Sequence, residues 1–293
     1  MVTAPDRLLL RLEWRVIRRL DGRIQGAYRT PYRGSGLDFA GLRAYVEEDD
    51  ARHIDWNATA RLGEPQVRQF TEDRELTVWL VLDRSASMTV GRPGRGKQDV
   101  LAELALVLAR LFGRGGNRVG AVLHDGAATK VVPPGTGRAH ALRIGHEIER
   151  TAVPPPVTTD FAVMLDAVSS LARRRSLIII VSDFIGTGEW DRPLLRLVHR
   201  HDVVALRVVD AADDDLPEAG LLLVEDAETG EQLLVDTSDP LFRSRYAAGV
   251  GARDAELNGR MRRAGVPFHR IDTDRDVLQA LVAVVAGTRW RRA

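Results

Sequence analysis

Short apolar runs alternate with helix-like periodicity through most of the chain after Leu76. The apolar runs predict strands at residues 77–83, 118–125, 129–133, 176–183, 202–210 and 266–271. The periodic segments predict helices at residues 99–112, 138–150, 161–171, 190–200, 241–264 and 275–287. Because apolar strands that alternate with helices build a parallel sheet covered on both faces, we predict an α/β domain over residues 76–293.

Two parts of the chain depart from this alternation. Residues 221–236 predict a β-hairpin that turns at Thr229-Gly230 and decorates the domain. Residues 1–75 predict an N-terminal arm, with an amphipathic helix at 7–20, a loop at 21–36 and a strand at 66–70. We expect this charged arm to pack on the core of the α/β domain.

Composition narrows the class of protein. The 293 residues are 44% hydrophobic and 28% charged, which excludes a chain that is disordered throughout. There is no cysteine, and therefore no disulfide framework, no thiolate nucleophile and no cysteine-bound zinc. Neither a membrane span nor a signal peptide is evident in the sequence, so we expect a cytoplasmic location.

The small net charge of +1 hides a separation of charge along the chain. Residues 1–36 are strongly basic, whereas residues 213–239 contain many acidic residues and neither Lys nor Arg. These segments either pack together or face water, or the acidic one forms a surface patch for a basic partner. Nucleic acid is not expected as a partner.

Hydroxyl and carboxylate side chains stand at the ends of two predicted strands and at the start of a predicted helix. Asp83, Ser85 and Ser87 follow the first strand, Thr159 opens a helix, and Asp183 ends the most apolar strand. These positions would meet at the carboxyl edge of a parallel sheet, where ligands bind in open α/β sheets. Oxygen donors suit a hard cation such as Mg²⁺ or Mn²⁺. The alternative is that these side chains only cap turns and helices.

The spacing Asp83-x-Ser85-x-Ser87, followed by Thr159 and Asp183, resembles the metal-ion-dependent adhesion site of von Willebrand factor type A domains. Residues 34–88 further resemble the bacterial domain-of-unknown-function family 58, most specifically around residues 43–61. The resemblance implies a Rossmann-like von Willebrand type A fold and a non-enzymatic module for protein–protein interaction.

The resemblance also implies roles for the five residues. Ser85, Ser87 and Thr159 would bind Mg²⁺ through their hydroxyls, Asp83 would bind it directly or through water, and Asp183 would support these ligands. A partner protein would donate a carboxylate to the remaining coordination position. Members of the family suggest a MoxR-type AAA+ ATPase as that partner, in assembly or maturation of a client protein.

Other interpretations of the sequence stay open. The Asp83/Asp183 edge could serve a metal-dependent phosphoester hydrolase, although no His lies near the three motifs in sequence. The protein could also be a metal-free scaffold.

Residues 91–97 have the GxxxxGK spacing of a phosphate loop, but Gln98 stands where a Ser or Thr is needed. We therefore expect a flexible lid beside the site.

The charged run over residues 43–61 predicts a salt-bridged network that locks the arm to the sheet, rather than a catalytic site. Its charged members would surround Tyr45 and Trp56, and they are Arg43, Asp49, Asp50, Arg52, Asp55 and Arg61.

Overall fold

The structure is a computed structural model, and it describes residues 33–46, 49–71, 76–91, 94–114, 116–150 and 157–287. The chain divides into two compact units, whose described parts lie within residues 33–71 and 76–287. The predicted helix at 7–20 lies outside the described residues. The expected packing of the arm on the core stays a prediction.

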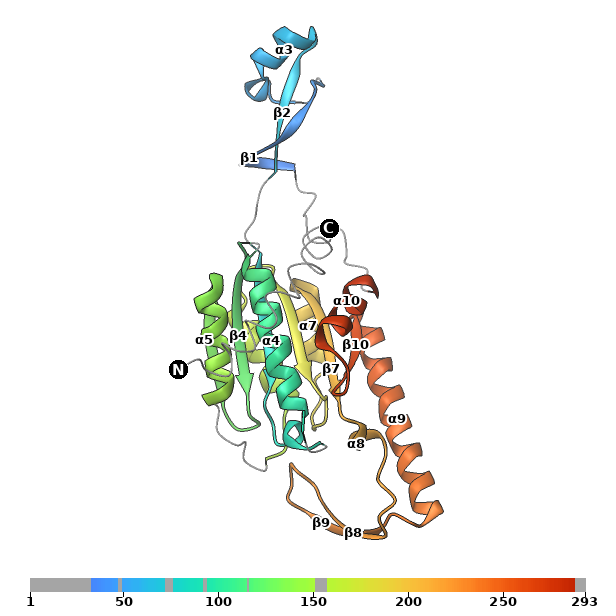
Figure 1. The fold of residues 1–293 in the computed structure, drawn as a ribbon. Coiled ribbons are helices and arrows are strands. Elements are labelled where there is room, and N and C mark those ends of the chain that lie inside the picture. Colours follow the sequence, from blue (N-terminus) through green and yellow to red (C-terminus); the bar gives the residue numbers. More distant parts are fainter. Residues whose placement is uncertain are drawn as a thin grey trace. The chain divides into compact units, whose positions relative to one another are not determined.

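A six-stranded sheet in the order β10-β7-β6-β3-β4-β5 forms the centre of the larger unit (Figure 1). All neighbouring strands are parallel except β4 and β5, which pair antiparallel. The strands are β3 (Thr77–Asp83), β4 (Arg118–His124), β5 (Thr129–Gly135), β6 (Leu177–Ser182), β7 (Asp202–Val209) and β10 (Phe268–Asp272). The predicted α/β class with a mainly parallel central sheet is confirmed.

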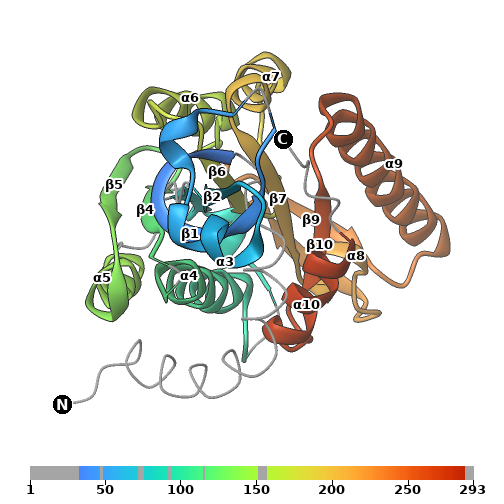
Figure 2. The same ribbon diagram turned by 90° about the horizontal axis from the view of Figure 1, so that it is seen from above.

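Helices cover both faces of this sheet (Figure 2). On one face lie α4 (Lys97–Arg114), α5 (Gly137–Arg150) and α10 (Val277–Gly287). On the other face lie α6 (Phe161–Leu171), α7 (Asp191–Arg200) and α9 (Pro240–Ala264). The short helices η2 (Ser87–Thr89) and α8 (Ala211–Asp214) follow β3 and β7.

The central strands are apolar because they are enclosed by both helical layers. Every residue of β6 is buried, and so is every residue of β3 after Thr77. One core cluster joins the sheet to α6, α7 and α9, and its large members include Trp79, Phe161, Ile178, Trp190 and Met261. Burial of such side chains supplies the main driving force for folding.

The register of the strands sets which residues meet at the carboxyl edge. Leu82 of β3 pairs with Val181 of β6, so Asp83 and Ser182 end neighbouring strands. Asp83 also pairs with His124 of β4. This edge of the sheet therefore gathers the polar residues that follow β3, β4 and β6.

The predicted hairpin over residues 221–236 is confirmed as β8 (Leu221–Glu225) and β9 (Gln232–Asp236). In Figure 1 it lies beyond the end of the sheet at which β4 finishes. Its strands leave much apolar surface in contact with solvent. The exposed fraction is between 63% and 68% for the side chains of Leu221, Leu223, Leu233 and Leu234.

The smaller unit contains β1 (Arg33–Ala44), η1 (Ala51–His53), α3 (Trp56–Leu62) and β2 (Gln66–Thr71), with β1 and β2 antiparallel. The strand predicted at 66–70 is confirmed, but the loop predicted at 21–36 is wrong at its end, because β1 begins at Arg33. Asp55 caps α3 by accepting hydrogen bonds from the amides of Asn57 and Ala58.

The charged network predicted around Tyr45 and Trp56 is present in part, and its role in locking the arm to the sheet stays a prediction. Arg43 forms an ion pair with Asp49, and Arg52 lies 3.5 Å from Asp50, but Trp56 is 69% exposed. These contacts are local to the smaller unit, and ion pairs of this exposure contribute little stability.

Candidate functional site

Asp83 is fully buried at the end of β3 and is held by two hydrogen bonds. Its Oδ1 accepts from the backbone amide of Ser85 at 2.9 Å, which forms the tight turn after the strand. Its Oδ2 accepts from the hydroxyl of Ser182 at 2.6 Å, because β6 runs directly beside β3. The carboxylate is therefore fixed in one orientation at the edge of the sheet.

The two serines connect this turn to Asp183. The hydroxyls of Ser85 and Ser87 lie 3.0 Å apart, and the hydroxyl of Ser87 donates to Asp183 Oδ1 at 3.3 Å. All three residues are buried. The structure thus joins four of the five predicted residues, Asp83, Ser85, Ser87 and Asp183, within one local network.

Thr159, the fifth predicted residue, lies on a loop that adjoins the one after Asp183. Its carbonyl oxygen accepts from the amide of Thr187 at 3.0 Å. A Cβ atom on Gly186 would lie 2.6 Å from the same carbonyl oxygen, so glycine is needed for this close approach. The residue is fully buried, and its hydroxyl has no hydrogen-bond partner within the described part of the chain.

The loop after β6 carries backbone strain beside the site. Phe184 has a φ of 57°, in the left-handed region that non-glycine residues rarely adopt. The amide of Phe184 donates to the hydroxyl of Ser182 at 2.7 Å. The ring of Phe184 stacks on the ring of Phe161, with centroids 5.6 Å apart. These contacts hold the strained turn and so direct Asp183, whose Oδ1 also accepts from the amide of Ile185 at 3.0 Å.

A buried lysine enters the site from the start of α4. The ammonium of Lys97 donates to Asp183 Oδ2 at 2.8 Å and to Asp213 Oδ1 at 3.0 Å. Burial would lower the pKa of Lys97, but the two carboxylates outweigh it and raise this pKa. Lys97 therefore neutralises part of the negative charge at this edge.

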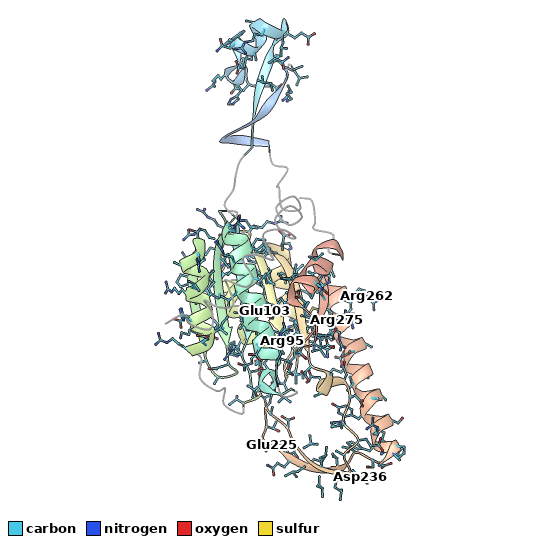
Figure 3. The ribbon with its side chains drawn as sticks, in the orientation of Figure 1. Arg95, Glu103, Glu225, Asp236, Arg262 and Arg275 are labelled. Carbon is cyan, nitrogen blue, oxygen red and sulfur yellow. The ribbon has the colours of Figure 1, made fainter. Side chains whose placement is uncertain are left out.

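The segment before α4 is anchored at its described end. Arg95 donates to the backbone oxygens of Thr273 at 2.8 Å and Arg275 at 2.7 Å, and it pairs with Glu103 (Figure 3). Arg95 and Lys97 are thus tied to the rest of the larger unit, and the expectation of a flexible lid over residues 91–97 stays a prediction. This segment lies beside the site, as expected, because Lys97 contacts Asp183.

The carboxylates at this edge are close enough to affect each other. Burial, together with the charge of Asp183, raises the pKa of Asp83 to about 7. A site that forces two carboxylates together without enough positive charge favours protonation or the binding of a cation.

One family model matches most of this chain. The family model described as "Protein of unknown function DUF58" matches residues 41–256. The chain belongs to the DUF58 family. An uncharacterized protein of Mycobacterium tuberculosis is 38% identical over 283 residues, which cover 95% of this chain and 88% of that protein.

Solved structures similar to this DUF58 chain include BatB from Bacteroides thetaiotaomicron, at 15% identity and a TM-score of 0.44, covering 72% of this chain and 97% of BatB. The VWA domain of SpRpn10 matches at 12% identity and a TM-score of 0.39, covering 75% of this chain and 98% of that domain. Matches at this level carry no argument about activity or partners. Among the described residues, no helix is both long and apolar enough to cross a membrane.

The donor set of this DUF58 site fits Mg²⁺. It offers three hydroxyls and two carboxylates, and oxygen atoms are the ligands that Mg²⁺ prefers. The buried hydroxyl of Thr159 lacks a partner among the described residues, as a metal ligand would in a structure without metal. No group of three His, Cys, Asp or Glu side chains that could hold a metal is found in the described ranges, so any metal here depends on hydroxyl ligands.

Sequence reasoning missed four residues of this edge: Lys97, His124, Ser182 and Glu228. Ser182 precedes Asp183 directly, and Lys97 ends the GxxxxGK spacing, so both lay within motifs already noticed. His124 ends β4 beside Asp83, with Nδ1 2.9 Å from the hydroxyl of Thr129. No histidine lies near the three motifs in the sequence, but His124 lies near Asp83 in space, where the hydrolase alternative could use it.

Proposed function

We propose that this protein is an interaction module that binds a carboxylate of a partner protein through Mg²⁺ at the carboxyl edge of its sheet. The observations that carry the proposal are the buried network of Asp83, Ser85, Ser87 and Asp183 and the unpartnered, buried hydroxyl of Thr159, whose loop contacts the loop after Asp183. Hydroxyls and few carboxylates would leave the cation electrophilic, which favours an additional anionic ligand.

The five predicted residues would have different roles at such a site. Ser85, Ser87 and Thr159 would hold the metal through neutral oxygens, and Asp83 would hold it directly or through water. Asp183 presents Oδ1 toward Ser87 while Oδ2 is taken by Lys97. The bound metal would supply a positive charge and a free coordination position for the partner's Glu or Asp.

The proposed partner is a MoxR-type AAA+ ATPase, with the module acting in assembly or maturation of a client protein. The support for this choice is the resemblance to family 58 over residues 34–88. The family membership supports a role in protein interaction and leaves the partner as a proposal.

A second candidate is an interaction module that uses no metal. One observation favours it: Lys97 already places a buried positive charge 2.8 Å from Asp183. In that case Lys97 would balance the site carboxylates, and the serines would serve only as capping groups. Binding of the partner would then be independent of Mg²⁺.

A pull-down from native lysate tests the proposal and the second candidate together. We expect the wild-type chain to capture a partner in Mg²⁺ and to lose it in EDTA, and Asp83→Asn to lose it in both buffers. The control variant Asp166→Asn alters an exposed carboxylate that pairs with Arg196 and should behave as wild type. Capture that is unchanged by EDTA and by Asp83→Asn would remove the metal from the mechanism.

A further inference from the structure

The turn of the β8–β9 hairpin places a carboxylate at the proposed metal site. Glu228 Oε2 accepts a hydrogen bond from the backbone amide of Thr159 at 3.2 Å. The two residues are 69 positions apart, and Thr159 is one of the five predicted site residues. The hairpin therefore reaches the carboxyl edge of the sheet through this side chain.

Glu228 is buried although it lies on an exposed turn. Its exposed fraction is 6%, whereas Thr229, Gly230 and Glu231 beside it are all exposed. Asp226 fixes the turn by accepting from the amides of Glu228 at 2.8 Å and Thr229 at 3.0 Å. The turn thus presents one acidic side chain to the site and keeps the others in solvent.

Two buried oxygens on this contact lack partners. Within the described part of the chain, neither Glu228 Oε1 nor the hydroxyl of Thr159 has a hydrogen-bond partner. A buried carboxylate with a free oxygen, next to a free hydroxyl, is the arrangement that a shared cation would satisfy.

The hairpin itself is only lightly attached to the domain. Its residues Leu221, Leu223 and Leu234 are more than 60% exposed, and Val235 is the buried apolar residue of the two strands. Segments that bury little apolar surface open at low free-energy cost. The contact of Glu228 with Thr159 is therefore able to form and break while the domain stays folded.

We propose that Glu228 is a built-in carboxylate that occupies the position of the partner's carboxylate, so that the hairpin closes the site until a partner displaces it. This inference rests on the proposed function. It adds a competing ligand from the chain itself and assigns a role to the acidic segment that contains the hairpin.

Mn²⁺ in place of Mg²⁺ gives a direct test on the full chain. Electron paramagnetic resonance measures the affinity for Mn²⁺, and water-proton relaxation reports the water molecules on the bound ion. The variants are Glu228→Gln and, as a matched control, Glu231→Gln, which alters an exposed carboxylate on the same turn. Amide hydrogen exchange at Thr159, without metal, compares Glu228→Ala with Glu231→Ala.

We expect Glu228→Gln to weaken Mn²⁺ binding about tenfold and to raise the relaxation enhancement per bound ion, because water replaces the carboxylate. Acetate should reverse that rise in Glu228→Gln and have no effect on wild type or Glu231→Gln. Exchange at Thr159 should accelerate in Glu228→Ala alone, since this change removes the acceptor of its amide.

The possible failures can be told apart. If wild type binds Mn²⁺ and Glu228→Gln matches it in affinity and relaxation, the role of Glu228 is overturned and the proposed function stands. Unchanged exchange at Thr159 in Glu228→Ala would also overturn the role of Glu228. If wild type binds no Mn²⁺, the proposed metal site fails first and the inference falls with it.

Discussion

Thr159 contributes a buried hydroxyl that has no hydrogen-bond partner among the described residues. Leaving such a group unpaired costs about 1–3 kcal/mol. The cost is explained if the hydroxyl serves as a metal ligand rather than as a structural donor. Removal of this hydroxyl should then weaken metal binding without lowering the stability of the metal-free chain.

The substitution Thr159→Val tests this at the level of one atom. Because valine keeps the shape and removes only the unpaired hydroxyl, we expect the free energy of unfolding without metal to stay the same or rise. Affinity for Mg²⁺, measured by calorimetry, should fall at least tenfold.

Thr237→Val is the matched control, since Thr237 is also fully buried but its hydroxyl is bonded to the backbone of Gly220 and Ala219. This variant should lose about 1–3 kcal/mol of unfolding free energy and keep its Mg²⁺ affinity. A Thr159→Val protein that is destabilised as much as Thr237→Val would show that the hydroxyl of Thr159 is structural.

Lys97→Met removes the ammonium that is paired with two carboxylates. Breaking a buried ion pair from one side typically costs about 3–5 kcal/mol, and we expect a loss of this size in denaturant unfolding without metal. Mg²⁺ should restore part of it, because the metal supplies positive charge beside Asp183.

Lys130→Met provides the comparison, because the side chain of Lys130 is 50% exposed and its pair with Glu147 should contribute less than about 1 kcal/mol. If Mg²⁺ does not raise the unfolding free energy of Lys97→Met, and partner capture by the wild-type chain persists in EDTA, the metal-free module is favoured.

At the scale of elements, the loop over residues 183–188 holds the strand end of Asp183 against the loop of Thr159. Gly186 permits the contact, because a Cβ there would lie 2.6 Å from the Thr159 carbonyl and 2.9 Å from the ring of Phe161. The two loops cannot both keep their positions if this residue carries a side chain.

Gly186→Ala is therefore expected to separate the loops, lowering the melting temperature and weakening Mg²⁺ binding together. Gly249→Ala, in α9 with no atom within 4 Å of the added Cβ, should instead stabilise by about 0.5–1 kcal/mol through helix propensity. Normal Mg²⁺ binding by Gly186→Ala would show that the proximity of these loops is not needed.

Apolar periodicity predicted the elements after Leu76 because these strands and helices bury continuous apolar faces. Helix α6 matches its predicted bounds, Phe161–Leu171, and β3 matches Thr77–Asp83. The smaller unit was harder to predict. Its helix α3 has no buried residue, so no apolar stripe marks it in the sequence.

At the scale of the whole molecule, the site combines residues that follow different strands. Loop motifs indicated Asp83, Ser85, Ser87, Thr159 and Asp183, because each stands at an end of a predictable element. Glu228 could not be assigned in this way, since nothing local in an acidic segment tells which carboxylate turns inward. Only the placement of the hairpin against Thr159 distinguishes it.

Metal binding should also be visible in the stability of the whole chain. A ligand present at about 100-fold over its dissociation constant stabilises the folded state by about 2.7 kcal/mol when the unfolded chain does not bind it. The larger unit contains all five proposed ligand positions and should account for this gain.

Calorimetric titration of Mg²⁺ into the metal-stripped wild-type chain tests the central claim most directly. The account predicts saturable binding of a single Mg²⁺ per chain, with a rise in melting temperature that disappears in Ser87→Ala. Ser170→Ala, which alters an exposed serine bonded to the carbonyl of Asp166, should bind as wild type does. Absence of binding heat and of any thermal shift in the folded wild-type chain would contradict the account.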